Sequence, residues 1–251
     1  MIDIPLLKLR ARHEIGNEEE RAIREAVSEI VRHPADTTVV HAGVTLHFSI
    51  LLLEGMMCRY KDLSNGQRQI TALHVAGDFV DLHGFVLHHL DHSLMTLTRC
   101  RVAHVPHERL TEITRTFPHL TRMLWFSTCL DGSIHREWMV SIGRRTAIAR
   151  VAHLFCELHA RLAVVGLADD TSFALPITQA ELAECVGLTP VHVNRVLRQL
   201  REGGTIEFRS SRATILDRAR LEQIAEFDPG YLYLRRRRTY SAVAESRMSR
   251  R

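Results

Sequence analysis

The residues best suited to chemistry lie between positions 178 and 212, a segment that combines arginine, asparagine and hydroxyl side chains. Arginine can donate two hydrogen bonds to guanine, asparagine can pair with adenine, and valine can touch the thymine methyl group. Projected at about 100° per residue, Val191, Arg195 and Arg198 fall on one side of a helix, opposite Val193 and Leu200. Such a helix buries one face and offers the other to a major groove.

Two helices joined by a tight turn must hold these side chains. Thr178 and Glu181 form the S/T-x-x-E capping box that starts a helix, and Gly187 can end it in the left-handed conformation. Thr189 then caps a second helix that begins at Pro190, where a missing N–H costs nothing. Because the turn is so short, the helices must cross steeply, which predicts a helix-turn-helix unit.

A hairpin wing is predicted next, from strands at 205–208 and 213–216 around an arginine- and serine-rich tip suited to phosphate contact. Seven arginines and three acids between Arg195 and Arg220 give this segment a local charge of +4. Any capped helix pair could show the same spacing, and charged helix faces are often simply solvated, but the wing and the local charge favour DNA. The predicted DNA contacts are Thr178, Gln179, Thr189, Pro190, Val191, His192, Asn194, Arg195, Arg198, Arg201, Arg209, Ser210 and Arg212.

The charge of the whole chain is a poorer guide. The 251 residues carry +4, but residues 232–251 hold seven arginines and one acid, so the other 231 residues carry −2. We expect this arginine-rich segment to be a disordered or non-specific arm. The hydrophobic fraction of 45% and the charged fraction of 25% are typical of globular proteins.

Neither a membrane nor an oxidising compartment is indicated. No apolar run approaches the ~20 residues that span a bilayer, and the N-terminus lacks a secretory segment. The five cysteines, Cys58, Cys100, Cys129, Cys156 and Cys185, are odd in number and widely spaced, so each is expected to be a small buried residue. A cytoplasmic protein is predicted, with a redox-sensing cysteine as the alternative.

The first 118 residues predict an antiparallel β domain. Strand-length segments at 46–53, 56–60, 69–75 and 94–105 are separated by turn signals, among them Asn65-Gly66, and residues 18–32 are expected to form a short leading helix. The turns then vanish, which predicts a long helix at 119–142 and another at 144–162. In the first of these helices, a stripe of Leu120, Leu124, Ser127, Ile134 and Trp138 predicts pairing with a second copy, with packing on its own domain as the alternative.

These patterns together resemble the Crp/Fnr transcription regulators. Ala183, Gly187 and Val193 occupy the small, turn and core positions of the family's helix-turn-helix, and the resemblance extends over residues 20 to 230. It carries over to Glu54-Gly55, to the segments 59–61 and 65–70, and to Gly77-Asp78-Phe79, all similar to the effector-sensing β-roll. Residues 189–195 and 227–232 are particularly similar to α-proteobacterial members.

The resemblance implies an α+β fold in four parts. These are a β-roll sensor at 1–118, a dimerisation helix at 119–142, a winged helix-turn-helix at 143–231 and the tail at 232–251. It also implies a homodimer that binds a palindromic operator at half-sites ~34–36 Å apart, with RNA polymerase as a partner and a signal relayed through the central helix. The implied effector pocket comprises Gly77, Asp78, Phe79, Asp81, Leu82, His92 and Ser93.

Departures from the family's motifs argue against two of the cofactors that its members bind. Where cyclic-AMP-binding members place a Gly-Glu start and an Arg-Ser pair, this chain has Asp81-Leu82 and His92-Ser93, so no cyclic nucleotide is expected. No cysteine precedes Cys58, which disfavours a 4Fe–4S cluster. Pro190-Val191 replaces the Arg-Glu pair of many recognition helices, so only Arg195 carries over as a base contact.

The alternatives are a cyclic-nucleotide- or metal-binding sensor protein and a small β-barrel metalloenzyme. His83, His88, His89, Asp91 and His92 could bind zinc or iron, but their spacing is irregular, so we assign no metal site. No nucleophilic triad, phosphate-cradling loop or spaced carboxylate pair is present. We therefore expect a non-enzymatic protein whose effector is unknown.

Overall fold

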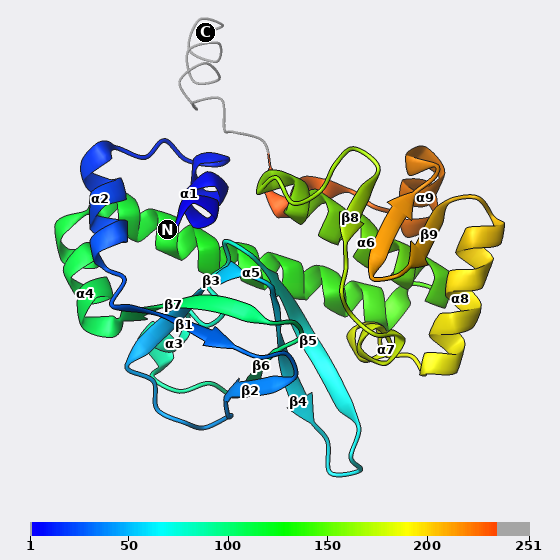
Figure 1. Cartoon of the computed structure of the whole chain (residues 1–251), viewed down its shortest axis with the longest axis horizontal. Helices are drawn as coiled ribbons and strands as arrows, with labels where there is room; N and C mark the ends of the chain where they lie inside the picture. Colours follow the sequence, from blue (N-terminus) through cyan, green and yellow to red (C-terminus); the bar gives the residue numbers. More distant parts are fainter. Residues whose placement is uncertain (1, 235–251) are drawn as a thin grey trace, which may run out of the picture.

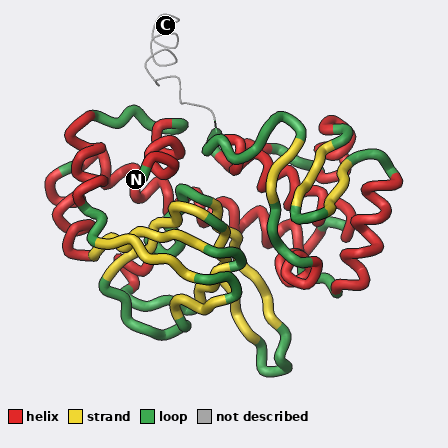
Figure 2. Tube along the Cα trace, viewed as in Figure 1, coloured by secondary structure: helices red, strands yellow, loops and turns green. Residues whose placement is uncertain are grey.

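One long helix, α5 (Pro118–Arg144), crosses the molecule and joins two lobes (Figure 1). The computed structural model describes residues 2–234. The strands of the N-terminal lobe lie on one side of the molecule, and a second group of strands lies among the C-terminal helices (Figure 2). The expected arrangement of an antiparallel β-roll, a long helix and a winged helix-turn-helix is confirmed.

The β-roll consists of two antiparallel sheets. The first has the order β2-β6-β4-β5, formed by Thr37–Val40, Ser93–Thr96, Met56–Asp62 and Arg68–Val75. The second has the order β1-β7-β3, formed by Glu29–His33, Cys100–Pro106 and Phe48–Glu54. Ile50 and Leu52 join Met57, Leu94 and Val102 in the apolar core between the sheets.

The outer face of the second sheet is covered by helices. Because side chains alternate along a strand, Leu51 and Leu53 point away from the roll interior and join a separate apolar cluster with Val105. The covering helices are α1 (Asp3–Arg10), α2 (Asn17–Glu25), α4 (His107–Thr116) and the first half of α5. Burial on both faces therefore explains the apolar run at positions 50–53.

Two predicted elements of this lobe have other bounds in the structure. The helix expected within 18–32 ends at Glu25, and Glu29–His33 is strand β1, paired residue by residue with β7. The strand expected at 94–105 is two strands, because β6 and β7 belong to different sheets. The Asn65-Gly66 turn does join β4 to β5, and of the two residues only Gly66 has a positive φ.

The C-terminal lobe packs its helices around α6 (Ala147–Val164). These helices are α7 (Gln179–Val186), α8 (Pro190–Glu202) and α9 (Arg218–Ala225), whereas the short α3 (Gly84–Leu87) lies in the β-roll. The sheet of this lobe has the order β8-β10-β9, formed by Ser172–Ala174, Arg212–Ile215 and Ile206–Arg209. None of the described helices is long and apolar enough to span a membrane.

The C-terminal boundary differs from the expected one. A 3-10 helix, η1 (Pro229–Leu232), ends on Leu232, which is 0% exposed and belongs to the core of this lobe. The predicted arm therefore does not begin at Leu232. The arginines at 235–238, 247, 250 and 251 lie outside the described residues.

The stripe predicted for pairing of α5 faces inward. Leu120, Ile134 and Trp138 are buried within the chain, and Leu124 packs against the cluster beneath the second sheet. Ser127 donates its hydroxyl hydrogen to the Met123 carbonyl, one turn back. The alternative interpretation, a stripe packed on its own protein, is correct for these five residues, because α5 lies between two lobes that each cover part of it.

Candidate nucleic-acid interface

The helix-turn-helix forms through local hydrogen bonds, as the sequence predicts. The Thr178 N–H donates to Glu181 Oε2 at 2.6 Å, and the Glu181 N–H donates back to Thr178 Oγ1 at 3.1 Å, which completes the capping box. Gly187 ends α7 with φ of 63°, in the left-handed region. The Thr189 hydroxyl then accepts the His192 N–H at 3.2 Å and starts α8.

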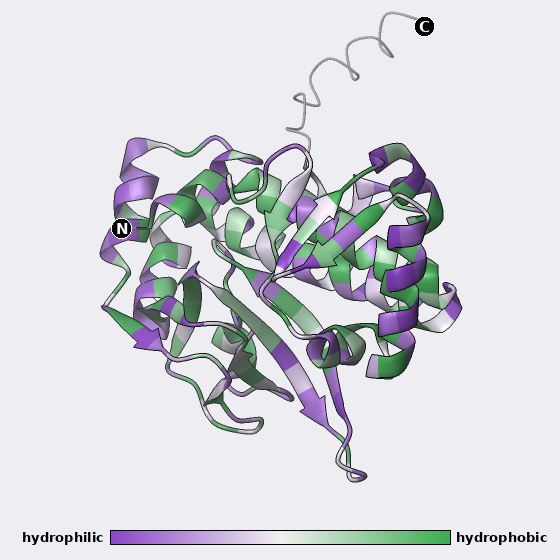
Figure 3. Ribbon diagram, turned by 45° about the vertical axis from the view of Figure 1, so that its right-hand side comes forward, coloured by the Kyte–Doolittle hydropathy of each residue, from purple (hydrophilic) through white to green (hydrophobic). Residues whose placement is uncertain are grey.

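Helix α8 presents one apolar and one polar face. Val193, Val196 and Leu200 are buried in the lobe, whereas Val191 is 73% exposed. Figure 3 shows hydrophilic and hydrophobic segments alternating along this helix at the right of the molecule. The predicted contacts on α8 that are exposed are Pro190, Val191, His192, Asn194, Arg195, Arg198 and Arg201. The geometry therefore leaves the predicted reading face open.

Helix α7 fixes one of the predicted base-reading side chains. Asn194 Nδ2 donates to Gln179 Oε1 at 3.1 Å, and both side chains are exposed. This bond limits the rotamers that Asn194 can adopt. Thr178, the N-cap of α7, lies beside Gln179 on the same exposed helix end.

The wing is held by a contact that the sequence did not reveal. β9 and β10 pair antiparallel, and Ser210 at the tip has φ of 49°. Arg212 donates to Asp169 Oδ2 at 3.1 Å, while Arg209 pairs with Glu207 at 2.8 Å. Asp169 lies just before β8, which begins at Ser172 and extends the wing sheet.

Two side chains connect the helix-turn-helix to the rest of the protein. Arg150 on α6 donates to the Val186 carbonyl at 2.7 Å and to the Ile142 carbonyl at 2.9 Å, so it joins the C-terminal ends of α7 and α5. Gln69 on β5 donates to the Glu184 carbonyl at 2.6 Å. The Arg150–Val186 and Gln69–Glu184 contacts join positions 36 and 115 residues apart in sequence, and no local pattern marks them.

A buried ion network joins the two lobes. Arg161 on α6 donates to the Leu73 carbonyl at 2.6 Å, to Asp78 Oδ2 at 2.9 Å and to Glu157 Oε1 at 3.0 Å. Lys8 of α1 also pairs with Asp78. Glu157, which is fully buried, accepts from Trp138 Nε1 at 3.1 Å and from the Tyr231 hydroxyl at 2.9 Å. Burial raises the pKa of Glu157, and these donors oppose that shift.

The structure divides the predicted effector residues. Gly77, Asp78, Phe79 and Leu82 line a cavity bounded by α1, α2, α4 and α5. The other three do not line it. Asp81 is buried and accepts the Ile50 N–H at 2.6 Å, His92 contacts Asp91 at 2.9 Å, and Ser93 accepts the Ala42 N–H at 3.1 Å. Burial raises the pKa of Asp81 to about 7.

The cysteines differ in exposure. Cys58, Cys100, Cys156 and Cys185 are buried, and burial raises the pKa of each thiol, to about 12 for Cys58 and Cys156. Cys129 on α5 is exposed, so the expectation of burial was wrong there. Among residues 2–234 no group of three or more histidine, cysteine or carboxylate side chains is arranged to hold a metal ion.

Comparison with known proteins agrees with this organisation. Residues 149–224 match a family described as the Crp-like helix-turn-helix domain, and residues 30–117 match the cyclic nucleotide-binding domain. The transcriptional activator protein FnrL of Cereibacter sphaeroides is 30% identical over 215 residues, which cover 84% of this chain and 86% of FnrL. The nitrogen fixation regulation protein FixK of Bradyrhizobium diazoefficiens is 32% identical over 175 residues, 69% of this chain and 72% of FixK. The structure of FixK2 from Bradyrhizobium japonicum superposes with a TM-score of 0.69 at 24% identity, covering 79% of this chain and 97% of FixK2.

Proposed function

The chain belongs to the Crp/Fnr family of DNA-binding transcription regulators, and from this premise we propose that it binds a palindromic operator as a homodimer. The observation that carries the proposal is the open face of α8, where Val191, Arg195 and Arg198 are exposed beside a capped helix start. A two-fold axis would place the two copies of α8 in successive major grooves, ~34–36 Å apart. Each copy of the wing would then lie over the flanking phosphates.

Selection from a pool of random DNA duplexes tests this proposal. We expect the retained duplexes to share two inverted half-sites whose centres lie about one helical turn apart. The matched control is Arg115→Gln, which removes an exposed guanidinium on α4, far from α8 in the sequence, and should leave the selected motif unchanged. Retention of all duplexes equally would contradict a sequence-reading role for α8.

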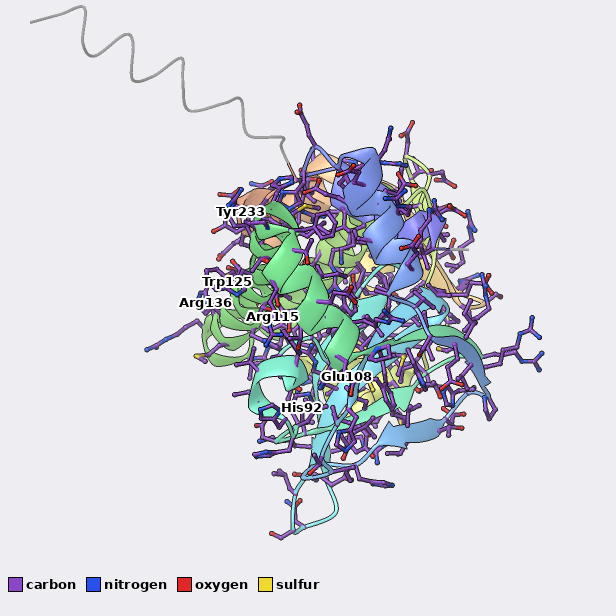
Figure 4. The ribbon with its side chains drawn as sticks, turned by 90° about the vertical axis from the view of Figure 1, so that its left-hand side faces the viewer. His92, Glu108, Arg115, Trp125, Arg136 and Tyr233 are labelled. Atoms are coloured by element: carbon purple, nitrogen blue, oxygen red, sulfur yellow. The ribbon has the colours of Figure 1, made fainter. Side chains whose placement is uncertain are left out.

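Pairing of the subunits is best supported by the outer face of α5. Arg122, Trp125, Cys129, Gly132, Arg136, Met139 and Gly143 follow one another at alternating spacings of three and four residues. This is the heptad spacing of a two-stranded coiled coil. Trp125 is 68% and Met139 is 73% exposed, and Figure 4 shows Trp125 and Arg136 along the same outer edge of the molecule. The inward stripe predicted from the sequence lies on the other side of this helix.

The exposed thiol of Cys129 tests this face of α5. In a parallel pair of helices the two copies of Cys129 meet across the two-fold axis, so mild oxidation should link the subunits covalently. Cys129→Ser should abolish the link, since the other four cysteines are buried. Thr116→Cys in that variant, an exposed position on α4, should not restore it. A monomer in sedimentation equilibrium would contradict the dimer.

We also propose a route by which a signal reaches the DNA and a partner that the bound regulator contacts. Gln69 links the β-roll to the end of α7, and Arg150 links α7 to the end of α5, so a change in the packing of α5 would reorient α8. Such coupling requires a signal that favours one arrangement over the other. Relatives named as activators suggest RNA polymerase as the partner, which transcription in vitro with the host polymerase would test.

Neither a cyclic nucleotide nor a 4Fe–4S cluster is part of this proposal. Apolar side chains fill the space between the two sheets, and Asp81, in the stretch that corresponds to the phosphate-binding stretch of cyclic-AMP-binding members, is a buried carboxyl. The residues present therefore do not fit a cyclic nucleotide. Calorimetry with cyclic AMP and cyclic GMP should show no heat of binding, and a stoichiometric titration would contradict this part of the proposal.

A further inference from the structure

The cavity that contains Gly77 and Asp78 lies outside the β-roll. Leu51 and Val105 form its floor, and both belong to the cluster on the outer face of the second sheet. The N-terminal segment, the middle of α4 and the first two thirds of α5 form its walls, and Arg161 reaches it from the other lobe. In Figure 1, α1 and α2 stand above the β-roll beside α5. Elements from both lobes therefore meet around one space.

Most of the lining is apolar, but the charged groups in it are unbalanced. Lys8, Arg12, Arg59 and Arg161 line the cavity, against two carboxylates, Asp78 and Asp131. Lys8 and Arg161 both pair with Asp78, and Arg59 pairs with Asp131. Among the described residues no carboxylate pairs with Arg12. The wall therefore carries one guanidinium whose charge the protein does not compensate directly.

Arg12 and its neighbour also have unsatisfied polar atoms. Arg12 Nη1 and Nη2 donate to the carbonyls of Lys8 and Leu232, at 3.5 and 3.1 Å, but its buried Nε has no partner. The buried Nε2 of His13 and that of His74 also lack partners, and both residues line the same cavity. Burial and the charge of Arg161 lower the pKa of Arg12 to about 10. Buried polar atoms without partners are rare in folded proteins, and a bound group is one explanation for them.

We propose that this cavity binds a small organic monocarboxylate, with its carboxylate at Arg12 and His13 and its apolar body among Leu51, Leu82 and Met123. An apolar lining with few convergent polar groups is the usual form of a small-molecule site. The cavity of about 90 Å³ is small, which suits a ligand with a compact body. A multiply charged phosphate ester does not suit so apolar a wall.

The position of Arg12 gives such a ligand access to both lobes. Arg12 reaches across to the Leu232 carbonyl, and the cavity is continuous with the Asp78–Arg161 contact between the lobes. A carboxylate that competes for Arg12 would weaken its hold on η1. In this role as an effector site the inference rests on the proposed function, whereas ligand binding itself does not.

Calorimetry and thermal unfolding of the full chain test the site, with benzoate as the probe and benzamide as its neutral isostere. We expect benzoate to bind and to raise Tm, and benzamide to bind at least about tenfold more weakly. Arg12→Gln should weaken benzoate binding at least about tenfold, because a hydrogen bond to a charged group is lost. The Tm of the free protein should stay close to that of the wild type, because the loss of a half-buried charge without a carboxylate partner offsets the loss of the two hydrogen bonds to carbonyls. Arg115→Gln, on the outer surface of α4, should leave benzoate binding unchanged.

Ala26→Leu provides a second variant if Arg12→Gln does not fold. Ala26 is buried and lines the cavity, so a larger side chain there should fill the space and abolish benzoate binding. Equal affinity for benzoate and benzamide would overturn the proposal, as would failure of both benzoate and hexanoate to bind at millimolar concentration. These outcomes concern the cavity alone, whereas failure of the duplex selection would overturn the proposed operator.

Discussion

The outer face of α8 and the buried network around Arg161 are both built from arginine, yet they serve opposite purposes. On α8 the guanidinium groups of Arg195 and Arg198 are exposed and available to a partner outside the protein. Arg161 is 8% exposed, and its hydrogen bonds go to Leu73, Asp78 and Glu157. The same side chain is thus exposed to solvent in one region and joins two lobes in the other.

The difference lies in the cost of removing water. An exposed arginine keeps its hydration and contributes little to folding, whereas a buried arginine must recover its lost hydration from carboxylates and carbonyls. The network can therefore be tested through stability and the α8 face through DNA binding. If the comparison is right, substitutions in the two regions should change different measurements.

The largest effect is expected at Arg161. Arg161→Met should lower the free energy of unfolding by about 3–5 kcal/mol. The substitution leaves the buried Glu157 carboxylate without its cationic partner, and it leaves Asp78 with Lys8 alone. Urea denaturation measures the change. Arg195→Ala, on the exposed face, should stay within about 0.5 kcal/mol of the wild type in the same assay. Equal losses in the two variants would break the comparison.

A smaller effect is expected at Arg195, and it should appear in DNA binding instead of stability. Arg195→Ala should cost about 1–3 kcal/mol of binding free energy on the selected operator and relax discrimination at one base pair. Binding titrations on the operator and on single-base variants measure both quantities. A uniform loss on every duplex would instead identify Arg195 as a phosphate contact.

The buried His153 extends the comparison to the pH dependence of stability. Burial lowers the pKa of His153 from 6.5 to about 3, with a further contribution from Arg145, although Glu137 lies 3.4 Å from its Nε2. Between these two pKa values the unfolded chain binds a proton that the folded one excludes. The contribution of His153 is therefore complete above the unfolded pKa and is lost as pH falls, by about 1.4 kcal/mol per pH unit. His153→Phe should flatten the pH dependence of unfolding, which urea denaturation at a series of pH values measures.

The helix-turn-helix could be predicted because its signals are local. The Thr178–Glu181 box, the left-handed Gly187 and the Thr189 cap each act within a few residues, and the structure contains all three. The α4 helix and strand β8 were not predicted. Strand β8 is three residues long and exists because it pairs with β10, about 40 residues away. The N-terminal helices likewise gain their burial from the outer face of the β-roll.

Periodicity in α5 was visible in the sequence, but its orientation was not. The stripe through Leu120, Ile134 and Trp138 is correct as an apolar face, yet only the packing of both lobes against α5 shows that it points inward. The heptad of Trp125 and Met139 on the other side could have been counted from the sequence. Its glycines and arginines made it the weaker of the two apolar signals.

By itself, the sequence determined the capped helix pair, the buried and exposed faces of α8 and the alternating strands, since these depend on hydrogen bonds and periodicities between near neighbours. Tertiary structure alone decided which face of α5 is exposed, that Arg161 joins the lobes and that Arg12 lines a cavity. These facts depend on residues far apart in the chain, such as Arg161 and Leu73, which are separated by 88 positions. Desolvation acts on groups brought together by folding, so the environment of a buried charge depends on the fold and not on its neighbours in sequence.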